Sequence, residues 1–230
     1  MSLKPFEGDT FVAFTDISGF KHLMRENKAL EALNCPYTSG YEELQNQRDI
    51  CGLFVSDCGI LYTIGDDKAS QFEKLLSVLK NINTKMLNKN YMLTTSIAYG
   101  YFSYHERNEF MGIQKTPLYG EAYVEAYLDN EKGSPKIFPG QCRIKKKYID
   151  DDLLQGSRFK EYIRCKKDYY YFYWNVKDPC YIEQFEKKYN NFYNRSYMNM
   201  LEALKQFNDG CVQNDAETLW IPSRVTLGRE

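Results

Sequence analysis

The sequence has 230 residues, and its 30 Lys and Arg nearly balance its 31 Asp and Glu, giving a formal net charge of −1. This balance argues against binding of nucleic acid or anionic lipid through bulk charge, so we expect neither as a partner. No apolar run approaches the roughly 18 residues of a membrane helix, and the N-terminus lacks a signal-peptide pattern, which predicts a cytoplasmic protein.

The N-terminal segment predicts a buried strand followed by a helix. Asp9–Asp16 is β-rich and mostly apolar, as a buried strand would be. After Ser18-Gly19 the apolar spacing becomes helical, and Cys35-Pro36 should end that helix. Tyr37–Asp49 is then a polar helix or a loop. The apolar face of the expected helix consists of Phe20, Leu23, Met24, Leu30 and Leu33.

Two short apolar runs, Gly52–Ser56 and Gly59–Ile64, predict a hairpin that turns at Asp57-Cys58. Gly65-Asp66-Asp67 ends the hairpin, and Ser70 is the expected N-cap of a helix with i, i+3, i+4, i+7 spacing. The apolar positions of that helix are Phe72, Leu75, Leu76, Leu79, Ile82 and Met86.

The middle of the chain continues the alternation of strands and helices. Met92–Phe102 predicts a strand, and Phe110–Ile113 is short and extended. Pro117–Gly120 turns into a helix over Glu121–Glu131, and Lys136–Ile144 returns as a strand after a Gly-Ser-Pro break. This order predicts an α/β fold, an α+β sandwich in which helices flank a mixed sheet.

The sequence pattern changes near residue 148, so we divide the chain into a domain over 1–147 and a C-terminal extension over 148–230. Tyr169–Val176 is interpreted as a structural strand in preference to a stacking platform for bases. Asp178-Pro179 predicts the start of a long amphipathic helix. Its apolar stripe consists of Ile182, Phe185, Tyr189, Phe192, Tyr193, Tyr197, Leu201 and Leu204.

The seven cysteines are scattered, never in a Cys-x-x-Cys pair, and accompanied by only two histidines. A zinc cage of Cys and His ligands is therefore not expected. We interpret the cysteines as buried or half-buried free thiols in a reducing compartment. They are Cys35, Cys51, Cys58, Cys142, Cys165, Cys180 and Cys211.

The most informative segment is Phe14–Phe20, in which a strand ends on a carboxylate and a Gly turn leads into a helix. Asp16 can hold a hard cation, and the carbonyl of Ile17 can add a second oxygen ligand. The backbone N–H groups of Gly19, Phe20 and Lys21 can point at phosphate oxygens. The simpler interpretation is that Asp16 only caps the helix.

A second carboxylate near the first would favour catalysis, because two-metal phosphoryl transfer needs acidic residues on neighbouring strands. Asp57 lies at the tip of the expected hairpin, which can bring it to Asp16. Asp66 follows the second strand and abuts a helix start, which suits a turn or a cap. We favour Asp57 as the partner of Asp16.

Phe-Thr-Asp-Ile-Ser-Gly-Phe at positions 14–20 resembles the first metal-binding motif of class III nucleotidyl cyclases. The closer resemblance is to the pyrimidine cyclases of the bacterial Pycsar anti-phage systems, and it covers about residues 9–144. The ordered set of further motifs that carries it consists of Phe54–Asp57, Ser96–Gly100, Pro117–Tyr127 and Pro135–Ile137.

The resemblance implies a palm-like fold, a homodimer with active sites at the subunit interface, and cyclisation of a nucleoside triphosphate to its 3′,5′-cyclic monophosphate and pyrophosphate. It implies that Asp16, the Ile17 carbonyl and Asp57 bind two Mg²⁺ or Mn²⁺ ions. It further implies UTP as substrate, slightly favoured over CTP, and a signalling role in anti-phage defence. The implied nucleotide-binding residues are Phe14, Gly19, Phe20 and Lys21.

The sequence also departs from the conventional cyclase pattern. Val124 and Leu128 stand near the places of the family's helical Asn and Arg, and Thr94-Thr95 replaces an Arg-Gly pair. One alternative is a purine cyclase, which is disfavoured because Leu53 stands about where that class carries a base-reading Lys. The other is a palm-like module that binds nucleotide or a partner without turnover. Possible substitute arginines are Arg48, Arg107 and Arg143, and the tyrosines Tyr119, Tyr123 and Tyr127 are interpreted as packing residues in preference to base-stacking ones.

Overall fold

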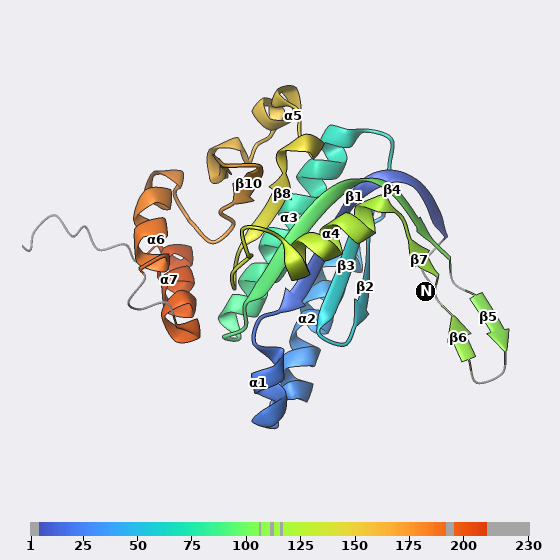
Figure 1. Ribbon diagram of the computed structural model, residues 1–230, viewed down its shortest axis with the longest axis horizontal. Coiled ribbons are helices and arrows are strands. Elements are labelled where there is room, and N and C mark those ends of the chain that lie inside the picture. The colour runs from blue at the N-terminus through green and yellow to red at the C-terminus, as the bar shows by residue number, and fades with distance from the viewer. Residues whose placement is uncertain (1–4, 106, 111–112, 116, 192–195, 211–230) are drawn as a thin grey trace, which may run out of the picture.

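The computed structural model describes residues 5–105, 107–110, 113–115, 117–191 and 196–210. A mixed sheet forms its centre, with the strand order β2-β3-β1-β4-β8-β10-β9 and β7 paired to the end of β4 (Figure 1). Only the β4–β8 pair in this sheet is parallel. The strands are β1 (Phe6–Ile17), β2 (Ile50–Val55), β3 (Cys58–Thr63), β4 (Leu93–Tyr104), β7 (Leu118–Tyr119), β8 (Cys142–Lys145), β9 (Ile163–Lys166) and β10 (Tyr169–Phe172), with β5 (Arg107–Phe110) and β6 (Ile113–Lys115) forming a separate pair.

Helices cover the sheet from both sides. α2 and α3 pack on one face, and α4 packs over β1 and β4 on the other (Figure 1). The helices are α1 (Phe20–Arg25), α2 (Ala29–Leu44), α3 (Lys68–Asn88), α4 (Glu121–Lys132), α5 (Asp151–Gly156), α6 (Ile182–Tyr189) and α7 (Tyr197–Asp209). The expected mixed sheet flanked by helices is therefore confirmed.

β1 is the central strand that positions the site. Its segment Phe11–Ala13 is fully buried between the two helical layers, which is why the sequence is apolar there on both alternating faces. β1 pairs antiparallel with β3 on one side and with β4 on the other. The predicted strand, the predicted hairpin and the strand that begins near Met92 are all confirmed.

The helix after the hairpin is confirmed, but its predicted cap is wrong. The side chain of Asp67, not that of Ser70, accepts hydrogen bonds from the first-turn N–H groups of Ala69 and Ser70. A carboxylate at this position also interacts favourably with the positive end of the helix dipole. Asp67 is therefore a better N-cap than Ser70, whose hydroxyl lies within the first turn. The predicted apolar positions of α3 are buried.

The expected single helix over residues 20–35 is two helices. The chain breaks after α1, where Asn27 adopts a positive φ of 58°, and α2 then runs through Pro36 to Leu44. Pro36 costs α2 one hydrogen bond, but packing of this helix on β2 and α3 compensates, with Gly40 against the ring of Phe54. Met24, assigned to the buried face, is exposed.

The C-terminal extension joins the same sheet through β10 and β9, so the sheet runs across the boundary at 147/148. Two strands on either side of this boundary are shorter than expected: β8 begins only at Cys142, and β10 ends at Phe172. Asp178 does cap the turn that begins at Pro179. The expected long helix is wrong: α6 ends at Tyr189, and α7 begins at Tyr197 behind its own Ser cap.

Several sequence-based expectations fall wholly or partly on residues outside the description. Such segments contain Phe192, Tyr193 and Cys211. They also contain the middle of Phe110–Ile113, whose first residue ends β5 and whose last residue begins β6. The six cysteines within the described residues are free thiols, as expected, although Cys165 and Cys180 are exposed. Among the described helices, none is long and apolar enough to cross a membrane.

A buried ion pair ties α4 to the sheet. Arg143 on β8 is 1% exposed, and its guanidinium donates to both carboxylate oxygens of Asp129 at 2.9 and 3.0 Å. The hydroxyls of Ser96 and Tyr169 also donate to Asp129, at 2.8 and 2.7 Å. Because β4, β8, β10 and α4 all contribute, this network fixes the helix over the sheet.

Candidate active site

The ends of three neighbouring strands bring a row of side chains to one face of the sheet. Asp16 of β1 lies opposite Cys58 of β3, which lies opposite Val55 of β2. Residues paired across antiparallel strands point to the same side, so these three side chains share one face. Phe14, two residues before Asp16, contacts Tyr127 of α4, which identifies this face as the one that α4 covers.

The hairpin turn places Asp57 beside this row, as the sequence predicts. Val55 pairs with Cys58, so Ser56 and Asp57 form a two-residue turn in which Ser56 has a φ of 54°. The N–H of Ile17 donates to the backbone carbonyl of Asp57 at 3.1 Å and fastens the strand end to the turn. The structure thus brings together the Asp16 and Asp57 carboxylates, with ligand atoms of Asp16, Asp57 and Cys58 all within 4.8 Å of one another.

The electrostatics of this cluster are unfavourable in the absence of a cation. Burial, followed by repulsion from the Asp57 carboxylate, raises the pKa of Asp16 from 3.8 to about 6. Burial and the neighbouring Asp16 carboxylate raise the pKa of the Cys58 thiol to about 12. Two half-buried carboxylates that repel one another are a suitable oxygen donor set for Mg²⁺ or Mn²⁺, so the residues present fit such ions.

The Gly19 turn follows the cluster directly. Gly19 has a φ of 79°, a conformation that favours glycine, and it leads into α1, where the N–H groups of His22 and Leu23 donate to the Gly19 carbonyl and those of Phe20 and Lys21 precede these bonds. Phe20 is buried and anchors the helix, whereas Lys21 is exposed. A Cβ at Gly19 would lie 3.7 Å from the ring of Tyr197, so α7 borders this turn.

The other residues predicted from the sequence lie at different places, some in the core and some away from the acidic cluster. Phe14 is 3% exposed and packs on Tyr127, so its side chain belongs to the core. Asp66 lies beyond the far end of β3, which begins at Cys58 and ends at Thr63, and it does not belong to the cluster. Arg143 is paired with Asp129 and is no substitute for a catalytic arginine, and Arg48 is exposed. The side chain of Arg107 lies outside the described residues.

α4 presents aromatic and aliphatic side chains beside the cluster. Tyr127 and Tyr119 are exposed, so their interpretation as core residues is wrong, whereas Tyr123 is half-buried and stacks on Tyr127. Val124 and Leu128 of the same helix are 45% and 41% exposed. The outer face of α4 therefore exposes Val124, Tyr127 and Leu128 between charged residues at the two ends of the helix.

The sequence reasoning missed Cys58 as a member of the site. Its thiol donates to Oδ1 of Asp16 at an Sγ–O distance of 3.5 Å. The signal that could have found it is strand register, because the residue after the hairpin turn pairs with the last residues of β1. Glu131 of α4 was missed as well, and its charge contributes to the raised pKa of Asp16.

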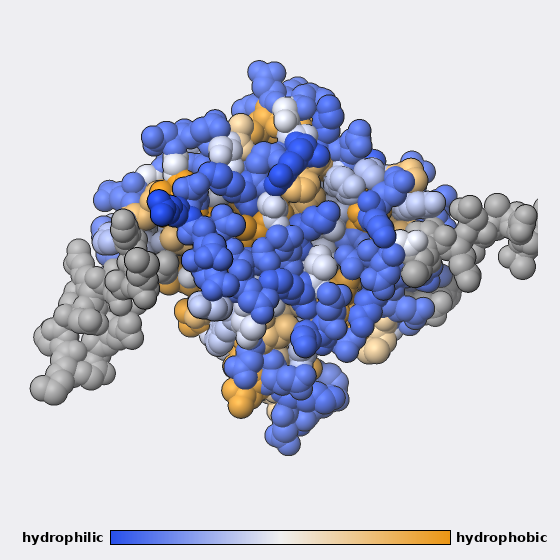
Figure 2. Space-filling view, turned by 180° about the vertical axis from the view of Figure 1, so that it is seen from behind, coloured by the Kyte–Doolittle hydropathy of each residue, from blue (hydrophilic) through white to orange (hydrophobic). Residues whose placement is uncertain are grey.

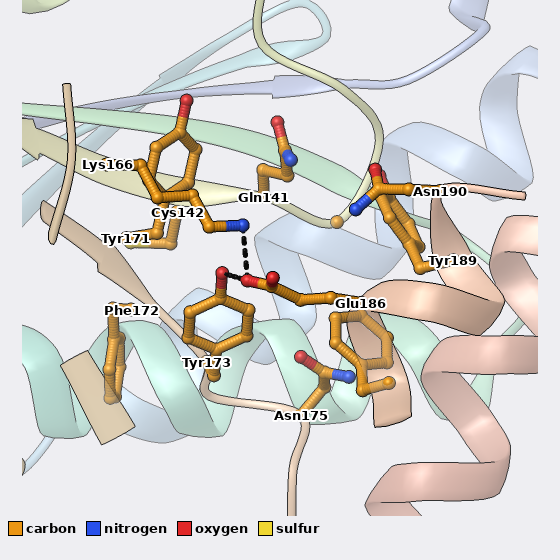
Figure 3. A pocket seen from close by; sticks show the side chains of 12 residues that line it. Gln141, Cys142, Lys166, Tyr171, Phe172, Tyr173, Asn175, Glu186, Tyr189 and Asn190 are labelled. Atoms are coloured by element: carbon orange, nitrogen blue, oxygen red, sulfur yellow. Dashed lines mark hydrogen bonds and ion pairs between the residues drawn. The ribbon is translucent and has the colours of Figure 1, made fainter. Parts of the chain in front are cut away.

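Two cavities lined by described residues lie away from the acidic cluster. Figure 3 shows a small cavity of about 20 Å³ between β10 and α6, where Glu186 accepts from Lys166 and Tyr173. That volume holds about one water molecule. A more open cleft of about 400 Å³ lies between α2 and the end of α3. On the side of the molecule opposite to Figure 1, the described surface is mostly hydrophilic, with apolar residues in small patches (Figure 2).

No protein-family model matches the sequence, and no curated protein matches it. Solved structures do match the fold. A dimeric guanylyl cyclase domain from the aquatic fungus Blastocladiella emersonii aligns with a TM-score of 0.56 and 12% identity, over 74% of this chain and 98% of that one. A monomeric guanylyl cyclase domain of the same fungus aligns with a TM-score of 0.51 and 12% identity, over 74% and 97% of the two chains.

A bacterial structure gives the same result. The adenylyl cyclase CyaB of P. aeruginosa aligns with a TM-score of 0.51 and 14% identity, over 74% of this chain and 96% of that one. The mixed sheet with α4 on one face and α2 and α3 on the other is therefore the palm fold of class III cyclases.

Proposed function

We propose that the chain is a metal-dependent nucleotide cyclase, which converts a nucleoside triphosphate to a 3′,5′-cyclic nucleotide and pyrophosphate. The observation that carries this proposal is the convergence of Asp16 and Asp57 at one end of the sheet in a class III cyclase fold. A structural carboxylate is normally paired with a cation or with strong hydrogen-bond donors, whereas Asp16 faces a second acid and accepts a weak hydrogen bond from the Cys58 thiol.

In this proposal the two carboxylates and the Ile17 carbonyl hold two Mg²⁺ or Mn²⁺ ions. Such ions, when bound, neutralise phosphate charge and make the ribose 3′-hydroxyl more acidic. The Gly19 turn offers the N–H groups of Phe20 and Lys21 to phosphate oxygens. Catalysis by the chain itself is then mainly positioning of the hydroxyl in line with the α-phosphorus.

The finer part of the proposal is a pyrimidine substrate, UTP in preference to CTP. Its support is the resemblance of the motifs to pyrimidine cyclases, together with Leu53 in place of a purine-reading lysine. Leu53 shares the face of Val55 and the acidic cluster, so an apolar side chain lies where the lysine would reach the base. The corresponding biological role is synthesis of a second messenger in anti-phage defence.

We also propose that the active unit is a homodimer whose second subunit completes each site. The face that carries the acidic cluster exposes apolar side chains that a monomer would leave in water, with Val55 at 67% exposure and Val124 and Leu128 on α4. One of the matching guanylyl cyclase domains is a non-canonical dimer, and another is monomeric. A subunit covering this face would bury the apolar residues and enclose the carboxylates.

The experiment is incubation of the purified chain with each of the four nucleoside triphosphates and Mn²⁺, with products identified by mass and by comparison with 3′,5′-cyclic standards. We expect cyclic UMP as the main product and its loss in Asp57→Asn. Asp66→Asn is the matched control, because this acid lies at the other end of β3 and should leave the yield unchanged. A cyclic purine product would overturn the pyrimidine assignment, and equal loss in both variants would overturn the choice of Asp57.

One observation favours a second candidate, a nucleotide-binding module without turnover. The exposed Val124 and Leu128 cannot donate hydrogen bonds to a developing charge, as an Asn and an Arg could. Isothermal titration with UTP and Mn²⁺ separates the two functions. Saturable binding that Asp57→Asn abolishes, with no cyclic product from any triphosphate, would establish the binding module and overturn the cyclase.

A further inference from the structure

Cys58 gives the acidic cluster a donor of a different chemical kind. Strand register fixes its side chain on the same face as that of Asp16, and the Sγ–Oδ1 distance between the two is 3.5 Å. Asp57 is its neighbour in the chain, and one ligand atom from each of the three residues lies within 4.8 Å of the others. All three side chains are half-buried, so an ion from solvent can reach them.

Two carboxylate oxygens and one sulfur do not form the all-oxygen set that Mg²⁺ prefers. A thiolate selects thiophilic divalent cations, of which Zn²⁺ is the commonest in proteins. Zn–S and Zn–O bond lengths of about 2.3 and 2.1 Å in a tetrahedral site place sulfur and oxygen about 3.6 Å apart. The Cys58–Asp16 separation of 3.5 Å already has this value.

We propose that Asp16, Asp57 and Cys58 form a three-ligand site for a thiophilic divalent cation of the Zn²⁺ class. On binding, a sulfur–metal bond forms, the thiol S–H bond breaks, and the proton leaves to solvent. The site shares its two carboxylates with the proposed function, so a bound Zn²⁺ displaces the Mg²⁺ or Mn²⁺ that cyclisation requires. Cys58 thereby makes the site sensitive to thiophilic metals.

The alternative is that the Cys58 thiol only donates a hydrogen bond to Asp16. A structural hydrogen bond of this kind requires no metal–sulfur bond, whereas a ligand produces one that can be seen directly. Cys51 provides a matched control, because it is another half-buried free thiol, on the adjacent strand β2, and it pairs with Tyr62 away from the acids.

The experiment is titration of the full chain with Co²⁺, a spectroscopic substitute for Zn²⁺, followed in the near ultraviolet for thiolate-to-cobalt charge transfer. We expect the band in the wild-type chain and in Cys51→Ser, its displacement by added Zn²⁺, and its absence in Cys58→Ser. Zn²⁺ affinity should fall at least about tenfold in Cys58→Ser. Mn²⁺ affinity, measured by electron paramagnetic resonance, should fall much less, because manganese prefers oxygen donors.

A band that persists in Cys58→Ser, no band in the wild-type chain, or equal losses of Zn²⁺ and Mn²⁺ affinity would overturn the proposal. Should Cys58→Ser fail to fold, alkylation of the wild-type chain decides. Zn²⁺ but not Mg²⁺ must then protect Cys58 from iodoacetamide, as read by peptide mass spectrometry, and absence of protection overturns the site.

The test is independent of the cyclase assay. A Cys58-dependent cobalt band in a chain that cyclises none of the four triphosphates would contradict the proposed function and leave the thiophilic site standing. Cyclic product without any cobalt band would do the reverse.

Discussion

Two acidic residues between α4 and the sheet lie in opposite circumstances. Asp129 of α4 is buried and receives donors from Arg143, Ser96 and Tyr169. Asp16, at the end of β1, faces the Asp57 carboxylate and a thiol. The charge of Asp129 is neutralised within the fold, whereas the charge of Asp16 is opposed by its surroundings.

The difference separates structural charge from functional charge. A buried ion pair that is fully hydrogen-bonded resists change, because removing one partner leaves the other uncompensated. Two acids held together without a cation cost stability, and such an arrangement persists where an external ion supplies the missing charge. The comparison therefore assigns Asp129 to the architecture and supports the proposal that Asp16 binds a metal ion.

The largest expected effect is loss of the paired charge. We expect Arg143→Met to lower the free energy of unfolding by about 3–5 kcal/mol, because Asp129 would stay buried without its cation. Lys145→Met is the control on the same strand, since Lys145 pairs with Glu125 at the surface and should cost less than about 1 kcal/mol. Urea unfolding followed by circular dichroism measures both. Equal losses would remove the distinction between the two sites.

The next largest effect is stabilisation of the fold by an added divalent cation. We expect Mn²⁺ at about 100 times its dissociation constant to stabilise the wild-type chain by about 2.7 kcal/mol. Asp57→Asn should abolish this gain, because it removes one of the two converging carboxylates. Thermal unfolding with and without Mn²⁺ gives the measurement. Full stabilisation of Asp57→Asn would show that Mn²⁺ binds elsewhere.

The sequence predicts those parts of the site that depend on local signals, and it misses those that depend on contacts between distant segments. The Gly turn after Asp16 and the hairpin tip at Asp57 are local signals, and together they predict that the two acids meet. The membership of Cys58 depends on register between β1 and β3, which no local pattern fixes. The buried pairing of Arg143 could not be predicted, because its partner Asp129 lies 14 positions earlier, on a different element.

The wrong element boundaries have the same origin. Pro36 is a strong local signal for a helix end, yet packing of α2 against β2 and α3 overrides it. The periodic stripe over residues 182–204 indicates one helix, but it belongs to two helices that pack on each other. Apolar periodicity records which side chains are buried, not whether the axis is continuous.

A smaller effect concerns the free energy of unfolding that is lost because Asp16 is ionised in the fold. Its pKa of about 6 lies above the ordinary 3.8, so its contribution to stability is fully present below about pH 4 and is lost as pH rises through 6. We expect Asp16→Asn, in a metal-free buffer at pH 7, to gain about 1–2 kcal/mol of unfolding free energy after solvent screening is allowed for. Urea unfolding at pH 4 and pH 7 tests this. A gain that is equal at both values would contradict the charge as its source.

The smallest effect distinguishes the sources of that raised pKa. The Asp57 carboxylate raises the pKa of Asp16 more than Glu131 does, and burial raises it most. We therefore expect Asp57→Asn to lower the pKa of Asp16 more than Glu131→Gln does, with a residual elevation in the double variant. Titration of the Asp16 carboxyl carbon by nuclear magnetic resonance in metal-free buffer measures each value. If Glu131→Gln produced the larger change, α4 rather than the hairpin would be the main source of repulsion, and Asp16 and Asp57 would be weaker partners than their separation indicates.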